Sequence, residues 1–129
     1  MLNHIATLEE ISKELKAIQS TIETEMSEDV QEAVERGNYC AAQMARTGKL
    51  LADAKIHRDR KLNGQIIAQM KKLSALPATT ANKFADALCE DENYMVNWCE
   101  RVNRACTHQL DWCRTLISKA KAEMTYSPS

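Results

Sequence analysis

The chain has 129 residues, the length of one domain, with only three glycines and two prolines. So few turn-forming residues exclude a turn-rich β-sandwich or barrel, and the many strong helix formers predict an all-α fold. No stretch approaches the length of about 18 apolar residues that a membrane span needs, and the start lacks a secretory signal. We therefore expect a cytoplasmic protein that does not cross a membrane. A single helical domain over residues 1–129 is predicted, as an elongated hairpin or a small bundle.

The formal net charge of −1 hides an uneven distribution of charge along the chain. Residues 1–36 carry nine acidic and three basic side chains, a net charge of −6. Residues 37–83 carry nine basic and two acidic ones (+7), and residues 84–129 carry five basic and seven acidic ones (−2). Such segregation indicates either contact between these segments, within one chain or between subunits, or an external anionic partner.

The first helix is expected over residues 4–26. Apolar residues recur there at spacings of three and four, as in a heptad seam. The seam residues are Leu8, Ile11, Leu15, Ile18 and Ile22. Such a seam packs either against the rest of the same chain or against a copy of itself, so these residues are the predicted oligomer seam of a homo-oligomer. Mostly leucine at one seam position and isoleucine at the other favours more than two strands if the seam self-associates.

A long basic helical segment is expected over residues 27–73. Ser27 is its predicted N-cap, because acidic residues follow in the first turn. Asn63-Gly64 is a turn dipeptide, so the segment is either one helix or two, and one unbroken helix of this length would need oligomeric support. The predicted apolar stripe consists of Val30, Val34, Gly37, Ala41, Met44, Gly48, Leu51, Leu62, Ile66, Met70 and Leu73.

A linker over residues 74–80, which contains Pro77, separates this segment from C-terminal helices over 80–124 and a tail over 125–129. The apolar stripe of the last helix is Met95, Cys99, Val102, Cys106, Leu110, Cys113, Leu116 or Ile117, Ala120 and Met124. Its cysteines are seven residues apart, about 10.5 Å along a helix, which is too far for a disulfide or a shared metal ion. We therefore expect reduced, buried cysteines in a reducing compartment, with no metal site and no cofactor.

The opposite, polar face of the last helix is predicted to bind a ligand. Its arginine, histidine and asparagine side chains offer directed hydrogen bonds, arginine suits phosphate, and an indole can stack on a base. The predicted ligand-binding residues are Trp98, Arg101, Arg104, His108, Trp112 and Arg114. The alternatives are that the tryptophans pack in the core and that the charged side chains pair with their helical neighbours.

A secondary basic cluster lies in the middle of the chain and consists of Lys55, Arg58, Arg60 and Lys61. These side chains wrap around their helix and do not make one patch, so a charged, exposed rod is the alternative to a binding site. No arrangement in the sequence supplies a nucleophile, a base and an electrophile stabiliser together. We therefore expect that the protein is not an enzyme.

Three segments resemble a group of small phage- and prophage-encoded helical proteins. They are LLADAK at residues 50–55, NYMVNWCERVN at 93–103 and THQLD at 107–111. The resemblance covers about residues 46–124, and the group has no established activity. It implies work in the cytoplasm of an infected bacterium, in DNA metabolism, virion assembly or the countering of host defence.

These observations predict a non-enzymatic binding protein for an anionic nucleotide or nucleic acid. In the phage setting, one form is an oligomeric sponge that sequesters a nucleotide immune signal. One alternative is a structural or protein-interaction oligomer whose polar face only joins subunits or a protein partner. Another is an accessory protein of phage replication or recombination that binds single-stranded DNA.

Overall fold

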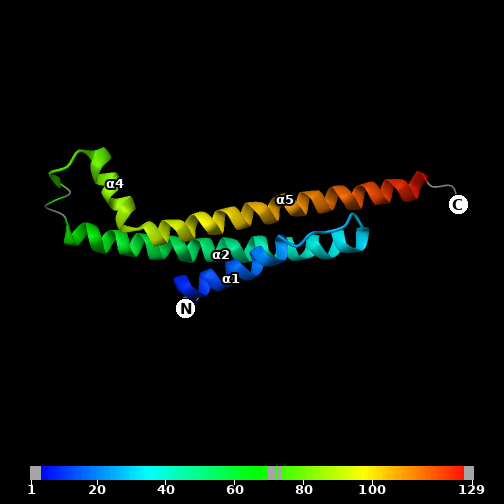
Figure 1. The fold of residues 1–129 in the computed structure, drawn as a ribbon, viewed down its shortest axis with the longest axis horizontal. Coiled ribbons are helices and arrows are strands. Elements are labelled where there is room, and N and C mark those ends of the chain that lie inside the picture. The colour runs from blue at the N-terminus through cyan, green and yellow to red at the C-terminus, as the bar shows by residue number, and fades with distance from the viewer. Residues whose placement is uncertain (1–3, 70–71, 73, 127–129) are drawn as a thin grey trace.

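The computed structural model describes residues 4–69, 72 and 74–126, and this part of the chain contains helices and no strand (Figure 1). The helices are α1 (Leu8–Ile22), α2 (Val30–Ala68), α4 (Ala78–Leu88) and α5 (Glu90–Tyr126). The predicted all-α fold is confirmed, and the packing of the helices is that of a small, elongated bundle.

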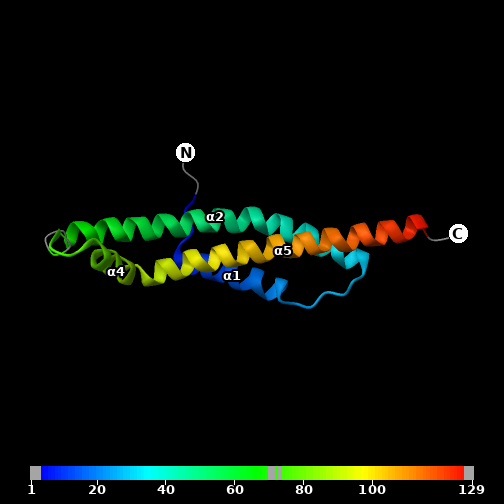
Figure 2. The ribbon, with the colours of Figure 1, turned by 90° about the horizontal axis from the view of Figure 1, so that it is seen from above.

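The two long helices, α2 and α5, form an antiparallel hairpin that sets the shape of the molecule. With 39 residues, α2 is about 58 Å long, and it runs without a break through Asn63 and Gly64. Figures 1 and 2 show α1 alongside the middle of the hairpin and α4 at the end where the chain turns back. Support for the long α2 therefore comes from α5 and α1 of the same chain.

The structure places the start of α1 later than the predicted boundary at residue 4. Thr7 is the N-cap: its side chain accepts a hydrogen bond from the Glu10 amide at 3.1 Å, and the Glu10 carboxylate accepts one from the Thr7 amide at 3.1 Å. This reciprocal capping box satisfies two amides that a helix start otherwise leaves without a partner. Residues 4–7 consequently precede the helix and are available for other contacts.

The N-cap of α2 is Asp29, so the prediction of Ser27 was wrong. The Asp29 carboxylate accepts hydrogen bonds from the backbone amides of Gln31 (3.1 Å) and Glu32 (3.2 Å). Ser27 instead bonds the Glu32 carboxylate through its amide and its hydroxyl. Serine and aspartate are both favoured at the N-cap position, and in this helix Asp29 occupies it.

The C-terminal boundaries also shift by a few residues. Pro77 is the N-cap of α4, within the predicted linker, and gives the start of the helix no side-chain hydrogen bond. At the other end, α5 includes Thr125 and Tyr126, which the sequence assigned to the tail. The rest of that tail lies outside the described residues.

Small side chains on α2 face the cysteines of α5 across the hairpin. Ala33, Cys40, Thr47 and Ala54 recur every seven residues on α2, and all four are buried. The α5 residues Cys99, Cys106 and Cys113 have the same repeat and are also buried, as the sequence predicts. The helices approach closely here: a Cβ atom built on Gly37 would lie 3.4 Å from the Cβ atom of Cys113.

The apolar stripe predicted on α2 coincides only in part with the buried side of the helix. Val30 and Val34 are 42% and 38% exposed, and Ala41 and Gly48 are also exposed. The prediction was wrong at these positions because polar residues, such as the fully buried Thr47, take part in the core. Met70 and Leu73 of the predicted stripe lie outside the described residues.

The apolar seam of α1 packs inside the chain. Ile11, Leu15, Ile18 and Ile22 are buried in one cluster with residues of α2 and α5, and Leu8 packs against the same cluster. This is the intramolecular alternative for the seam. Four of the five residues of the predicted oligomer seam are buried within one chain, and Leu8 is half-buried beside them.

The five cysteine thiols are free and buried, which makes them poor nucleophiles. Burial raises the pKa of Cys40 and of Cys99 to about 11. We expect iodoacetamide at pH 8 to leave the native protein unlabelled over a time in which all five thiols react after unfolding in guanidinium. Mass spectrometry of the labelled protein would check this, and rapid labelling of the native α5 cysteines would contradict the packing.

Candidate functional site

The exposed side of α5 carries five of the six predicted ligand-binding residues. Trp98, Arg101, Arg104, His108 and Trp112 follow one another at spacings of three and four. Arg101, Arg104 and His108 lie on the other side of the helix from the buried cysteines, and the two tryptophans, of which Trp98 is half-buried, lie at the edges of that side. We call these five residues the α5 strip. The sixth predicted residue, Arg114, lies about 160° around the helix from both tryptophans and forms an ion pair of 3.7 Å with Asp111. It does not belong to the strip.

The indole of Trp98 is held in place by α1. Its Nε1–H donates a hydrogen bond of 2.7 Å to Oε1 of Gln19, while the ring packs at the edge of the core. The ring of Tyr94, one turn earlier on α5, lies 6.1 Å from it at an angle of 59°. Sequence reasoning missed Gln19, because this partner is 79 residues away from Trp98 and no local pattern links the two.

The two arginines and the histidine of the strip are not used by the fold. Arg101, Arg104 and His108 are exposed, and none of the three has a hydrogen bond or ion pair within the part of the chain that the structure describes. Arginine side chains in this state keep all their donors available for a ligand. At the end of the strip, Trp112 is 49% exposed, which is unusual for so large an apolar side chain.

Only the beginning of the strip is concave. A groove of about 310 Å³ lies between α1 and α5 and is lined by Gln19, Ile22, Glu23, Trp98, Arg101, Val102, Ala105 and Gln109. Arg104, His108 and Trp112 lie outside it. Trp98 and Trp112 are 14 residues apart, or about 21 Å along the helix. The structure therefore arranges the predicted residues in a line and does not bring them together in one pocket.

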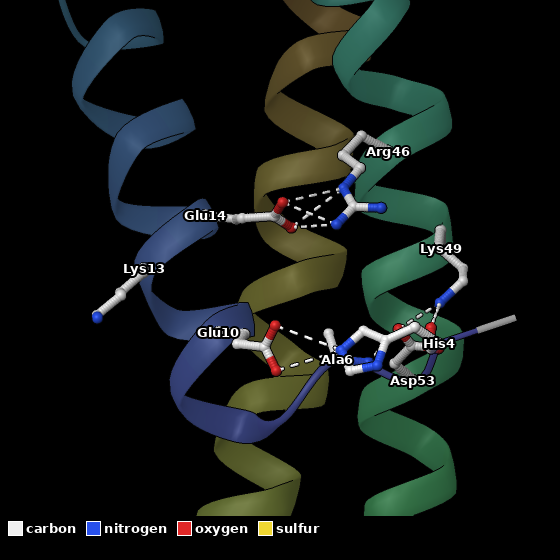
Figure 3. Close-up of a pocket in the computed structure, with 8 residues that line it drawn as sticks. All are labelled: His4, Ala6, Glu10, Lys13, Glu14, Arg46, Lys49 and Asp53. Carbon is white, nitrogen blue, oxygen red and sulfur yellow. Dashed lines mark hydrogen bonds and ion pairs between the residues drawn. The ribbon is translucent and has the colours of Figure 1, made fainter.

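A second cavity, of about 510 Å³, lies between the start of α1 and the middle of α2 (Figure 3). It is lined by His4, Ala6, Glu10, Lys13, Glu14, Arg46, Lys49 and Asp53. The Arg46 guanidinium binds both carboxylate oxygens of Glu14 at 2.7–3.2 Å, and His4 lies 3.3 Å from Glu10. Figure 3 shows Lys13 pointing away from these pairs.

The buried carboxylate of Asp53 anchors the segment before α1. It accepts hydrogen bonds from the Ala6 amide at 3.0 Å and from Lys49, which also donates to the His4 carbonyl at 3.0 Å. Nε2 of His57 lies 2.7 Å from the Ala6 carbonyl oxygen, so Asp53 and His57 hold this residue by its backbone on both sides. Burial acts to raise the pKa of Asp53, but the hydrogen bonds from Lys49 and Ala6 outweigh it and lower the pKa.

The side chains that line the second cavity thus hold α1 against α2. We call Arg46, Lys49 and Asp53 the clamp, because they bind Glu14 and the backbone of residues 4–6. Arg46 and Lys49 are already bound to carboxylates, so a phosphate group would have to displace Glu14 or Asp53 to reach them. The α5 strip, in contrast, has cations without partners. Of the two places, we therefore take the α5 strip as the candidate binding site.

The secondary basic cluster is spread around α2. Lys55 and Arg60 are exposed, and Arg58 pairs with its neighbour Asp59 at 3.2 Å. Lys61 reaches α5 and lies 3.2 Å from the buried carboxylate of Glu92. The four side chains do not form one patch.

Comparisons with protein-family models, with curated proteins and with solved structures find no match. Within the described residues, no three histidine, cysteine, aspartate or glutamate side chains are grouped so that they could hold a metal ion. None of the described helices is both long enough and apolar enough to cross a membrane.

Proposed function

We propose that the protein binds single-stranded nucleic acid along the α5 strip. The observation that carries the proposal is a pair of exposed arginines and a histidine without partners, placed along α5 between the half-buried Trp98 and the exposed Trp112. Sites for single strands combine cations that follow the phosphates with aromatic rings on which the bases stack. Of the functions that the sequence suggests, an accessory role in replication or recombination agrees best with this arrangement.

Each residue of the strip has a role in this proposal. Arg101 and Arg104 contact phosphates, and His108 donates a hydrogen bond to the backbone of the strand. Trp98 and Trp112 each stack on a base. With about 21 Å between them along the helix, the two indoles cannot hold the same base, and this separation favours a strand over a single nucleotide.

A free nucleotide in the groove between α1 and α5 is the second candidate. The groove holds the fixed indole of Trp98 beside Arg101, and its volume of about 310 Å³ is at the lower end of the range for small-molecule sites. This is the form that a sponge for a nucleotide signal would take. Glu23 in the lining opposes the binding of a phosphate group there.

The test is a titration with fluorescein-labelled oligo(dT), followed by anisotropy at several salt concentrations. Arg104→Ala is expected to weaken binding by about tenfold or more, because it removes a charge-assisted hydrogen bond. Arg114→Ala is the matched control, since it makes the same change ten residues later, outside the strip. With two phosphate contacts, we expect log K to fall with log[salt] at a slope of about −1.4.

A thermal-shift screen with mononucleotides and cyclic dinucleotides separates the two candidates. Stabilisation by one of them, without oligonucleotide binding, would establish the groove and overturn the proposal for a strand. Equal affinity of the Arg104→Ala and Arg114→Ala proteins for oligo(dT) would show that the strip is not the site.

A further inference from the structure

The groove between α1 and α5 contains a carboxylate that forms no ion pair with the described part of the chain. Glu23 lines the groove from α1 and Arg101 lines it from α5, yet the two side chains are not paired. Glu23 is exposed, and the hydrogen bond that its side chain makes among the described residues comes from Gln19 at 2.8 Å. An ionised carboxylate has about four acceptor sites, so most of them are available to a ligand.

Glu23 is held in place by the same side chain that fixes Trp98. Gln19 accepts the hydrogen bond of the indole at its Oε1 atom and donates one from Nε2 to Oε1 of Glu23. Because the indole N–H can only donate and the carboxylate can only accept, both bonds agree on one orientation of the amide. These hydrogen bonds fix the carboxylate and the indole relative to each other, across the two helices that form the groove.

The charge of Glu23 does not serve the helix on which it lies. Glu23 is the C-cap of α1, and the last turn of this helix contains no basic residue. The C-terminus of a helix carries a partial negative charge, which makes a carboxylate there unfavourable. Helix stability alone would favour a neutral or basic side chain at this position. A ligand therefore explains the carboxylate better than the fold does.

The rest of the groove suits one nucleobase. Its apolar lining consists of Ile22 on α1 and of Val102 and Ala105 on α5, beside the ring of Trp98. The volume of about 310 Å³ is at the lower end of the range for small-molecule sites. A flat base can stack on the indole and cover the apolar side chains while its polar edge reaches Glu23. The groove thus fits a base whose edge carries hydrogen-bond donors.

We propose, on the basis of the strand binding proposed above, that the base held in this groove is guanine and that Glu23 selects it. The Watson–Crick edge of guanine presents two adjacent donors, N1–H and the N2 amino group, which the two oxygens of a carboxylate can accept together. Cytosine and adenine present an amino donor beside an acceptor nitrogen, and thymine presents one N–H between two carbonyl oxygens. These acceptors repel a carboxylate, so guanine is the base that matches Glu23.

The two walls of the groove also orient the nucleotide. Glu23 repels phosphate, so the base and not the phosphate enters between the helices, while Arg101 on the other wall attracts the phosphate. The rest of the strand continues past Arg104 and His108 toward Trp112. The guanine thus anchors one end of the strand on the α5 strip.

Base preference is measured by fluorescence anisotropy with a labelled dodecamer of deoxythymidine and with dodecamers that carry one other base in the middle. A deoxyguanosine is expected to bind about tenfold or more tightly than a deoxyadenosine, the discrimination typical of a bidentate contact. Adenine is the critical comparison, because both purines stack well on an indole. Deoxyinosine keeps N1–H but lacks the N2 amino group, so it should recover only part of the gain. Equal affinities for the deoxyguanosine and deoxyadenosine dodecamers would overturn the proposal.

Glu23→Gln tests the residue itself. The glutamine has nearly the same shape and still accepts the hydrogen bond from Gln19, but it lacks the charge and the second acceptor oxygen. We expect the guanine preference to fall to about twofold or less, while the dodecamer of deoxythymidine binds no more weakly, since a repulsive charge is gone. A merely structural role of Glu23 would not change the base preference at an unchanged melting temperature.

Glu25→Gln is the matched control. It removes the same charge two residues later, from an exposed side chain that does not line the groove, and it should keep the full guanine preference. A preference that persists in Glu23→Gln, or that disappears equally in both variants, would overturn the role of Glu23.

Failure of the guanine preference can be told from failure of strand binding. Arg104 lies outside the groove, so Arg104→Ala should weaken all dodecamers alike and leave the ratio between deoxyguanosine and deoxyadenosine unchanged. If no dodecamer binds, but deoxyguanosine monophosphate raises the melting temperature of the wild type and not of Glu23→Gln, guanine recognition holds and the strand proposal fails. If neither the dodecamers nor the mononucleotide bind, both proposals are overturned.

Discussion

Replacing both Ile11 and Ile18 with aspartate is expected to detach α1 from the hairpin without changing the number of chains in the assembly. The two side chains are 0% and 5% exposed, and a carboxylate at either position would be buried without a partner. We expect the free energy of unfolding to fall by about 4 kcal/mol or more, which is the range of the most damaging substitutions. Urea unfolding would measure the loss.

Thiol labelling provides a second readout of the same variant. Cys99 is buried in the cluster that α1 helps to form, so its reaction with iodoacetamide should become rapid when α1 detaches. Lys16→Asp, on the exposed side of α1, is the matched control and should change stability by no more than about 0.5 kcal/mol. If the mass of the assembly fell while α1 stayed helical and Cys99 protected, the seam would join copies and not close one chain.

Removing the carboxylate of Asp53 is expected to have the next largest effect. Asp53→Ala leaves the Ala6 amide without an acceptor and Lys49 with only the His4 carbonyl, which should cost about 2 to 3 kcal/mol at pH 7. Asp59→Ala, which removes an exposed carboxylate six residues later, should cost no more than about 0.5 kcal/mol. Chemical denaturation of the wild type, Asp53→Ala and Asp59→Ala would measure these differences. Equal stabilities for the two variants would contradict the role of Asp53 in holding the segment before α1.

The contribution of Asp53 should depend on pH in a defined direction. Its pKa is lowered in the folded protein, whereas an unfolded aspartate titrates near 3.9. The folded state is therefore stabilised above that pH, and the stabilisation is lost as the pH falls through the folded pKa. Glu10, whose pKa is lowered by the hydrogen bond from the Thr7 amide, acts in the same direction. We expect the unfolding curves of the wild type and Asp53→Ala to converge as the pH falls below about 3.9 and through the folded pKa of Asp53.

Local patterns in the sequence predict the helices and two of the three packed faces. The isoleucines and leucines of α1 and the cysteines of α5 are regular enough to mark buried sides, and both are buried. The stripe on α2 is equally regular, yet Val34 and Gly48 lie on its uncovered side. Apolar periodicity shows that a side of a helix can be buried, but it does not show which partner covers it.

Buried polar residues account for the rest of the difference between the faces that the sequence predicts to be buried and those that the structure buries. Thr47 is fully buried because Asn103 on α5 donates hydrogen bonds to its hydroxyl at 2.8 Å and to the Met44 carbonyl at 2.9 Å. Asp53 is buried because Ala6 and Lys49 satisfy it. Except for Lys49, these partners come from distant parts of the chain. A polar residue in the sequence predicts exposure unless its partner is known, and only the fold supplies the partner.

The hydrogen bond between Gln19 and Trp98 makes the α5 strip depend on α1. A ligand that needs the indole in its present orientation binds more tightly when α1 is docked, because the ring is then already fixed. Thermodynamic linkage requires the reverse with the same factor: such a ligand stabilises the docked α1. Ligand binding to the α5 strip and docking of α1 onto the hairpin are thus coupled, and a change in one equilibrium shifts the other.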